Sequence, residues 1–228
     1  MSSTDRKFRI ALIHALSESV EPARAAFAEH WPEAYCFDLL DTSLAVDRVD
    51  RGSLDQHIHR RIHELADYAR ASNGRHGQTQ GILYTCSAFG PAIDAVKRNC
   101  PIPVLHPNEA AFEKALDFGT RIGLVVTFEP SAAALEAELL EMAADRGKAV
   151  QIRTVIAENA LPALKRGDGE SHDRLAAQAA SALVGVDTIV LGQFSLARAK
   201  AAVESSNTVP VLTTPQSAVE ALRKRLTG

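Results

Sequence analysis

Hydrophobic residues along the chain form two kinds of segment. Short apolar runs alternate with longer segments in which apolar positions recur three or four residues apart. Continuous apolar runs are typical of buried strands, and the wider spacing is typical of amphipathic helices. The apolar runs predict strands at residues 8–13, 34–40, 81–84, 102–105, 121–126, 150–156, 188–191 and 209–212.

The amphipathic segments between these runs predict helices. In residues 54–70, for example, Ile58, Ile62 and Leu65 stand on one helix face. Residues 74–80 predict a polar loop, and residues 167–169 predict a turn. Strands that alternate with helices indicate βαβ units and parallel sheets. The further predicted helices are 21–30, 88–99, 109–116, 130–146, 171–183, 196–205 and 216–226.

The chain also contains an internal repeat. The strand starting at residue 81 resembles the one starting at 188, and a Pro-Val-Leu segment at 103 recurs at 210, both 107 positions later. We therefore expect two pseudo-symmetric α/β subdomains with parallel sheets, residues 1–105 plus 213–228 and residues 106–212. Ligands of open α/β sheets bind beyond the carboxyl ends of strands, so we expect the active site in a cleft between the subdomains.

Cys86 is the strongest candidate for chemistry. It follows a predicted strand and precedes a predicted helix, whose N-terminal N–H groups favour a thiolate. We therefore expect a lowered pKa for Cys86, with Ser87 capping the helix. The alternative is a small buried core cysteine. Cys36 and Cys100 are interpreted as packing residues.

Polar residues also follow the other predicted strands, where they could contact a ligand. Helix capping explains the serines among them equally well, because capping and anion binding use the same N–H groups. His172 stands in the first turn of a predicted helix. It either reaches the cleft or lies on the surface. The residues after the first, fifth and seventh strands are His14 and Ser17; Thr127, Phe128 and Ser131; and Gln193, Phe194 and Ser195.

Composition excludes several classes of protein. With 46% hydrophobic and 23% charged residues, the chain is expected to be a folded globular protein. A formal net charge of -3 and the absence of a basic patch argue against nucleic acid as a partner. No segment is apolar enough for a membrane helix or a secretory signal, so we expect a cytoplasmic protein. No phosphate-binding glycine loop and no metal-ligand set is evident, so we expect neither a cofactor nor a metal.

Four segments together resemble the Asp/Glu/hydantoin racemase superfamily. They are residues 83–88 (LYTCSA), 103–110 (PVLHPNEA), 121–127 (RIGLVVT) and 188–193 (TIVLGQ). The resemblance implies a cofactor-independent isomerase that acts on the carbon next to a carboxylate or carbonyl. In typical members, two cysteines flank that carbon; one removes a proton and the other returns one on the opposite face.

The sequence matches the first of these cysteines at Cys86 but departs at the second. The repeat aligns Gln193 with the second cysteine, and an amide can donate a hydrogen bond but cannot carry a proton. We expect Gln193 to face the substrate opposite Cys86 and to stabilise an enolate oxygen. The leading hypothesis is an isomerase in which His14 or His172 replaces the second thiol. The alternatives are a single-cysteine lyase, similar to arylmalonate decarboxylase, and a non-catalytic protein that binds small carboxylates.

The resemblance also suggests roles for the remaining polar turns. It implies that Ser87, Thr127 and Ser131 bind the carboxylate of a small carboxylate or hydantoin-like substrate. His14 and Ser17 would add polar contacts. Phe128 and Phe194 would give the site apolar walls. Because members of this family are often dimers or larger, a homo-oligomer is also compatible with the resemblance. The identity of the substrate is not encoded in any of these motifs.

Overall fold

The computed structural model describes residues 8–228, which fold into two compact units. The N-terminal unit comprises the described residues up to Pro107 together with Ala218–Gly228, and the C-terminal unit is Asn108–Ser217. Each unit contains its own four-stranded parallel sheet. The predicted α/β class with two sheet-containing subdomains is therefore confirmed.

In the N-terminal unit, the strand order is β2-β1-β5-β6. The last helix of the chain, α10 (Thr214–Thr227), contributes most of its length to this unit. The other elements are β1 (Phe8–His14), η1 (Ser17–Ser19), α1 (Val20–His30), β2 (Ala34–Leu40), α2 (Ser43–Asp50), α3 (Gln56–Ala71), β3 (Asn73–Gly74), β4 (Gly77–Gln78), β5 (Gly81–Tyr84), η2 (Ser87–Phe89), α4 (Gly90–Asn99) and β6 (Val104–Leu105).

The C-terminal unit repeats this topology, with the strand order β8-β7-β9-β10. Strands β5 and β9 both begin and end 107 residues apart, as the repeat predicts. The elements are α5 (Glu109–Phe118), β7 (Arg121–Val126), α6 (Glu129–Asp145), β8 (Gln151–Ile156), α7 (Ala160–Lys165), α8 (Gly169–Ala180), β9 (Thr188–Leu191), η3 (Phe194–Ala199), α9 (Lys200–Ser205) and β10 (Val211–Thr213).

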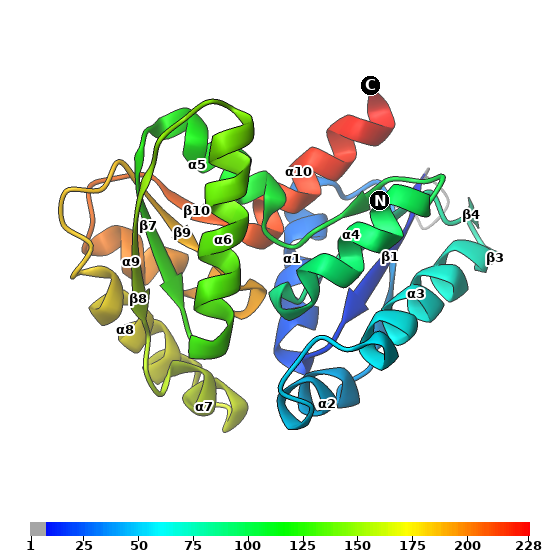
Figure 1. Cartoon of the computed structure of the whole chain (residues 1–228), viewed down its shortest axis with the longest axis horizontal. Helices are drawn as coiled ribbons and strands as arrows, with labels where there is room; N and C mark the ends of the chain where they lie inside the picture. The colour runs from blue at the N-terminus through cyan, green and yellow to red at the C-terminus, as the bar shows by residue number, and fades with distance from the viewer. Residues whose placement is uncertain (1–7) are drawn as a thin grey trace. The chain divides into compact units, whose positions relative to one another are not determined.

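Helices cover both faces of each sheet, as Figure 1 shows for the two units separately. Side chains of a strand alternate between its faces. In β7, Leu124 packs into one apolar cluster with α5 and α6, whereas Val125 packs into another with α8 and α9. In β1, Ile13 packs with α3 and α4. Both faces of the central strands are thus buried, which explains why they read as continuous apolar runs.

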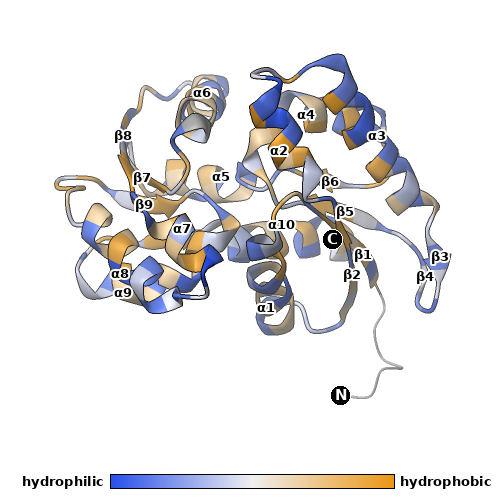
Figure 2. Ribbon diagram, turned by 90° about the horizontal axis from the view of Figure 1, so that it is seen from below, coloured by the Kyte–Doolittle hydropathy of each residue, from blue (hydrophilic) through white to orange (hydrophobic). Residues whose placement is uncertain are grey.

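The distribution of hydrophobic residues follows this layering. Figure 2 shows mainly hydrophobic colours along the strands and hydrophilic residues gathered on the helices, among them α3. In α3 the buried residues recur at helical spacing and include Ile58 and Ile62, as the sequence predicts. Among residues 8–228, no helix is long and apolar enough to cross a membrane.

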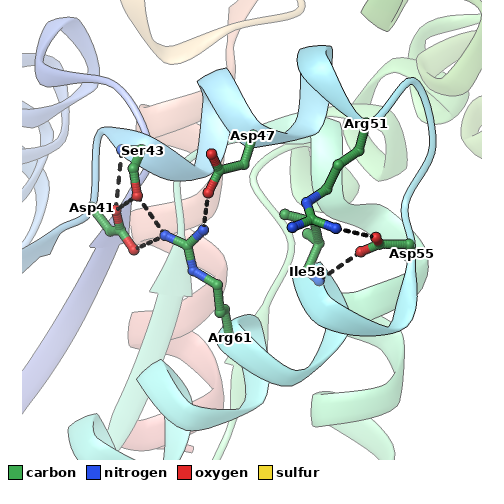
Figure 3. Close-up of polar contacts among 7 residues, drawn as sticks. All are labelled: Asp41, Ser43, Asp47, Arg51, Asp55, Ile58 and Arg61. Atoms are coloured by element: carbon green, nitrogen blue, oxygen red, sulfur yellow. Dashed lines mark hydrogen bonds and ion pairs between the residues drawn. The ribbon is translucent and has the colours of Figure 1, made fainter.

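Helix α2, which the sequence analysis missed, is fastened to α3 by a cluster of charged side chains (Figure 3). The Arg61 guanidinium donates hydrogen bonds to the carboxylates of Asp41 and Asp47. The Asp41 N–H donates to the His14 carbonyl at 3.0 Å. Short helices have too few residues for a clear period, and their stability depends on such tertiary contacts. This cluster fixes the start of α2 to the carboxyl end of β1.

Other predicted elements also differ from the structure. Residues 74–80 were expected to be a loop, but they contain most of the β3–β4 hairpin, which turns at His76 and Gly77 with positive φ angles of 74° and 87°. Helix α7 was not predicted. The helices expected at 88–99 and 196–205 begin instead with the 3₁₀ turns η2 and η3. Both 3₁₀ turns directly follow a strand at its carboxyl end, where the candidate site residues lie.

Candidate functional site

Cys86 lies at the carboxyl end of the sheet in the N-terminal unit, between β5 and η2. It is a free, half-buried cysteine that packs against the apolar cluster beneath α3 and α4. Burial raises the pKa of Cys86 to about 11, although the Ala88 N–H donates a hydrogen bond to the sulfur and opposes this effect. The predicted lowered pKa is wrong because desolvation outweighs the N–H groups of the turn.

The neighbouring Ser87 does not cap a helix, contrary to the expectation from sequence. Its position is the first residue of η2, and the N-cap position belongs to Cys86. Cys86 has an extended backbone, with φ −123° and ψ 120°, and makes no side-chain capping bond. Ser87 is half-buried, and the N-cap residues of η2 and α4 make no side-chain capping bond.

His14, at the end of β1, is completely buried and has partners at both ring nitrogens. Nδ1 lies 2.8 Å from the Thr85 hydroxyl, and Nε2 lies 3.0 Å from the Asp38 carboxylate. Asp38 also accepts a hydrogen bond from Arg24 Nε at 2.9 Å. Burial lowers the pKa of His14, and the Asp38 carboxylate opposes that shift. The ring has no unoccupied nitrogen in this structure, so the expected direct contact with substrate is not supported.

Ser17 and the two phenylalanines also differ in their availability. Ser17 is exposed, and its hydroxyl donates to Glu18 Oε2 at 3.1 Å. Phe128 is half-buried. Phe194, in contrast, is only 1% exposed. The ring of Phe194 is packed inside the protein in this structure, and the expectation that Phe128 and Phe194 give the site apolar walls stays a prediction.

In the C-terminal unit, the turns after β7 and β9 are joined by Gln193. The N–H and the hydroxyl of Thr127 both donate to Gln193 Oε1 at 2.7 Å. Gln193 Nε2 donates to the Ser131 hydroxyl at 3.3 Å. Ser131 in turn donates to the Phe128 carbonyl at 2.7 Å. The structure thus brings Thr127, Ser131 and Gln193 together, and the Gln193 amide oxygen accepts from both donors of Thr127.

Gly192 explains how the end of β9 approaches β7 so closely. A Cβ atom at this position would lie 2.8 Å from Leu124 Cδ1 and 3.3 Å from the Val125 carbonyl oxygen. The Gly192 N–H donates to that carbonyl at 2.9 Å. A side chain at residue 192 would therefore push apart the two strand ends that Gln193 connects.

His172 occupies the first turn of α8 and has no exposed surface. Its Nδ1 lies 2.8 Å from Asp173 Oδ1, which also accepts from Arg198 Nε at 2.8 Å. Its Nε2 is buried and has no hydrogen-bond partner among the described residues 8–228. The connection from β8 to β9 runs through α7 and α8, and the hydrogen bond from Arg198 to Asp173 holds the start of α8 beside η3, which follows the carboxyl end of β9.

Candidate residues of both units lie in a region that matches one protein family. The model of the Asp/Glu/hydantoin racemase family matches residues 15–222. The chain belongs to this family. Family membership supports an isomerase of the racemase type, and the matched range includes Cys86, Gln193 and His172. A search of curated proteins found no match.

Solved structures of racemases share the fold of this family member. A glutamate racemase isoform from Bacillus anthracis is 13% identical, with 97% of this chain and 82% of that chain covered and a TM-score of 0.73. An allantoin racemase from Pseudomonas fluorescens is 17% identical, with coverages of 96% and 91% and a TM-score of 0.71. An aspartate racemase homologue from Pyrococcus horikoshii is 14% identical, with coverages of 96% and 99% and a TM-score of 0.63. At these identities the likeness concerns the fold alone.

Three partners of the site residues in this racemase-family chain escaped the sequence analysis: Arg24, Asp38 and Thr85. Asp38 gave a signal that could have been used, because it is a charged residue inside the otherwise mostly apolar strand β2. Arg24 and Thr85 showed no comparable sequence signal apart from being close in the sequence to other candidate residues. Within the described part of the chain, no cluster of three or more His, Cys, Asp or Glu side chains is arranged to hold a metal ion.

Proposed function

We propose that the protein is a cofactor-independent isomerase that inverts the carbon next to the carboxylate or carbonyl of a small substrate. The proposed substrate class is a small carboxylate or a hydantoin-like ring, and Cys86 is the proposed acid/base. The observation that supports this role is a free cysteine two residues beyond the end of β5, at the carboxyl edge of a parallel sheet, whose sulfur accepts a hydrogen bond from the Ala88 N–H.

The raised pKa of Cys86 indicates which half of the reaction it performs first. With a pKa of about 11, the ligand-free cysteine is a thiol near neutral pH and can donate a proton. The reaction then begins with another group removing the proton from carbon. Cys86 acts as the base only in the reverse direction, from the thiolate that proton donation leaves behind.

His172 is the better candidate for that second group. Gln193 cannot carry a proton. Both ring nitrogens of His14 have partners, whereas Nε2 of His172 has none among residues 8–228. That nitrogen is fully buried in the ligand-free protein, so this assignment requires substrate binding to uncover it. Nδ1 of His172 contacts the Asp173 carboxylate at 2.8 Å, which leaves Nε2 as the nitrogen proposed to take the proton.

The proton and electron balance of this step is simple. Nε2 of His172 takes the proton from carbon, and the electron pair of the C–H bond remains on the substrate as an enolate. Cys86 then gives its S–H proton to the other face of the carbon, leaving a thiolate and an imidazolium. The His172 proton passes to water and Cys86 regains a proton from water, which restores both groups.

The carboxylate is proposed to bind to Ser87, Thr127 and Ser131, with Ser17, Phe128 and Gln193 as further contacts. Support comes from the Thr127 N–H and hydroxyl, two donors that converge on one oxygen atom. In the ligand-free protein that atom is Gln193 Oε1. A ligand carboxylate at Thr127 therefore requires the Gln193 amide to turn away, which frees its N–H groups for an enolate oxygen.

A single-cysteine lyase is a second candidate, favoured by the same thiol. A decarboxylase needs only one proton donor, because loss of carbon dioxide generates the carbanion itself. Cys86 is protonated near neutral pH, and Gln193 cannot titrate. Both features suit a reaction in which Cys86 alone protonates the carbanion, from one face.

Incubation in deuterium oxide with D- and L-glutamate, D- and L-aspartate, allantoin, 5-substituted hydantoins and an arylmalonate separates these functions. Inversion with deuterium at the inverted carbon supports the isomerase. Release of carbon dioxide from the arylmalonate, with one deuterium in the product, supports the lyase. Binding of any of these compounds without exchange, inversion or carbon dioxide release would contradict both and indicate a non-catalytic binding protein.

A further inference from the structure

The turn that contains Cys86 is joined to a buried chain of polar side chains. Asp38 of β2 accepts hydrogen bonds from Arg24 of α1 at 2.9 Å and from His14 of β1 at 3.0 Å. His14 Nδ1 lies 2.8 Å from the hydroxyl of Thr85, the residue before Cys86. The chain thus crosses three neighbouring strands at their carboxyl ends and stops one residue from the thiol. Only Arg24 is substantially exposed.

The partners of His14 fix its tautomer. An ionised carboxylate has no hydrogen to give, so His14 Nε2 must donate to Asp38. Burial lowers the pKa of His14, which keeps the ring neutral and leaves a lone pair on Nδ1. The Thr85 hydroxyl has two acceptors within reach, His14 Nδ1 at 2.8 Å and the Ile13 carbonyl oxygen at 3.3 Å, and the lone pair on Nδ1 at the shorter distance directs its hydrogen to His14.

Thr85 is consequently attached to β1 in two ways. Its main-chain N–H donates to the Ile13 carbonyl at 3.0 Å, and its hydroxyl is bound by His14. Thr85 is only 3% exposed. Cys86 follows directly in extended conformation, so the path of its backbone begins at a doubly fixed residue.

We propose that His14 is a positioning residue for Cys86: it fixes the Thr85 hydroxyl and thereby the direction in which the thiol projects from the end of β5. The inference rests on the proposed function only in taking Cys86 as the reacting group. A purely space-filling role would be served by apolar side chains without the cost of burying polar atoms. A satisfied polar chain, by contrast, specifies a single orientation.

Replacing Thr85 tests the proposal with little change in volume. In Thr85→Val the hydroxyl is lost, and we expect Cys86 to react with iodoacetamide about fivefold faster at a fixed pH, the factor typical of one net hydrogen bond. The pH–rate profile should also move to lower pH, since a loosened thiol is better solvated. Thr85→Ser keeps the hydroxyl and should restore both. The alkylated peptides are resolved by mass spectrometry, and Cys100 in the same digest serves as an internal reference.

Thr79→Val is the matched control. Thr79 is also 3% exposed, and both its N–H and its hydroxyl donate to the Ser72 carbonyl at 3.1 Å, in the same unit but away from His14. Its Cys86 profile should be that of the wild type. The proposal is overturned if Thr85→Val leaves the profile unchanged, or if Thr79→Val changes it equally.

A second measurement uses the unaltered protein and so does not depend on how a variant folds. Nitrogen-15 NMR of labelled histidine should show His14 at pH 7 with a hydrogen on Nε2 and none on Nδ1. The opposite tautomer or a charged ring would overturn the proposal. Neither measurement needs a substrate. A lack of turnover would therefore count against the proposed function alone, and an unchanged alkylation profile would count against the positioning role alone.

Discussion

The turns after β5 and β9 are counterparts in the two units, yet they use the equivalent residue differently. In both units, a side chain of this turn connects to the end of the neighbouring strand. In the N-terminal unit the connecting residue is Thr85, which leaves the Cys86 thiol outside the connection. In the C-terminal unit it is Gln193, 107 positions after Cys86, whose amide itself makes the connection.

This difference shows that the two repeated units have their candidate proton-transfer groups at different positions. The N-terminal unit has the titratable Cys86 at the repeated position. Its buried histidine, His14, contacts the preceding residue, Thr85. The C-terminal unit uses the repeated position for hydrogen bonding, and its buried histidine, His172, keeps one nitrogen without a partner in the described structure. Each unit has a buried histidine next to an Asp–Arg pair, but among the described residues only the histidine of the C-terminal unit has a ring nitrogen without a hydrogen-bond partner.

The largest expected effect follows from removing that nitrogen. In His172→Gln we expect inversion of substrate to fall by about 10²- to 10⁴-fold, the usual contribution of a general acid or base. Deuterium exchange should fall with it from either enantiomer, because the Cys86 thiolate forms only after His172 has taken a proton from carbon. Chiral chromatography and NMR of the same sample measure the two rates, and urea denaturation shows whether the variant is folded. Retained inversion in a folded His172→Gln would contradict the assignment of His172 as the second group.

The connection made by Gln193 should contribute measurably to stability. Gln193→Ala leaves the buried Thr127 donors without their acceptor, and we expect a loss of about 1–3 kcal/mol in the free energy of unfolding. Urea denaturation measures this loss. Gln178→Ala, at an exposed position of α8, is the matched control and should have little effect. Equal stability of the two variants would show that Gln193 does not connect the two turns in solution.

The thiol of Cys86 should react slowly in the ligand-free protein. With a pKa of about 11, we expect alkylation by iodoacetamide at pH 8 to be about 10- to 100-fold slower than that of free cysteine, and to keep rising to about pH 11. Peptide mapping after timed alkylation checks this. A plateau near pH 7 would restore the thiolate that the sequence suggested and remove the contrast with Gln193.

The smallest expected effect concerns the pH dependence of stability through His14. Its pKa is lowered on folding, so the unfolded chain binds the proton more readily. Stability is therefore complete above the unfolded value of about 6.5 and is lost as the pH falls below it. His14→Gln should flatten unfolding free energies between pH 7 and pH 5, whereas His57→Gln, at an exposed position, should not. Equal slopes in the wild type and His14→Gln would contradict the buried neutral ring.

The sequence predicted the fold well and the interactions within the site less well. Continuous apolar runs and the 107-residue repeat predict the bounds of β5 and β9 to the residue, since buried strands need continuous apolar positions. Short elements such as α2 depend on tertiary partners, here Arg61, which no local pattern reveals. The sequence also predicted that Cys86, Thr127 and Gln193 follow strands, and in the structure they lie after β5, β7 and β9.

The partners of those residues could not be predicted in the same way. That His14 points to Asp38 rather than to a ligand depends on the parallel register that sets Leu12 beside Asp38. The pKa of Cys86 depends on how deeply the end of β5 is packed, and the sequence alone suggested the opposite shift. The direction of a side chain and the depth of its burial depend on tertiary packing, which no local sequence pattern reveals.

The most direct test of Cys86 as the acid/base compares Cys86→Ser with Cys100→Ser in deuterium oxide, on whichever substrate the wild type exchanges. A hydroxyl is far less acidic than a thiol, so Cys86→Ser should lose exchange and turnover by at least about 10²-fold. Cys100→Ser should retain them, and unfolding free energies should show that both variants are folded. Retained exchange or turnover in a folded Cys86→Ser would contradict the assignment of Cys86 as the proton carrier.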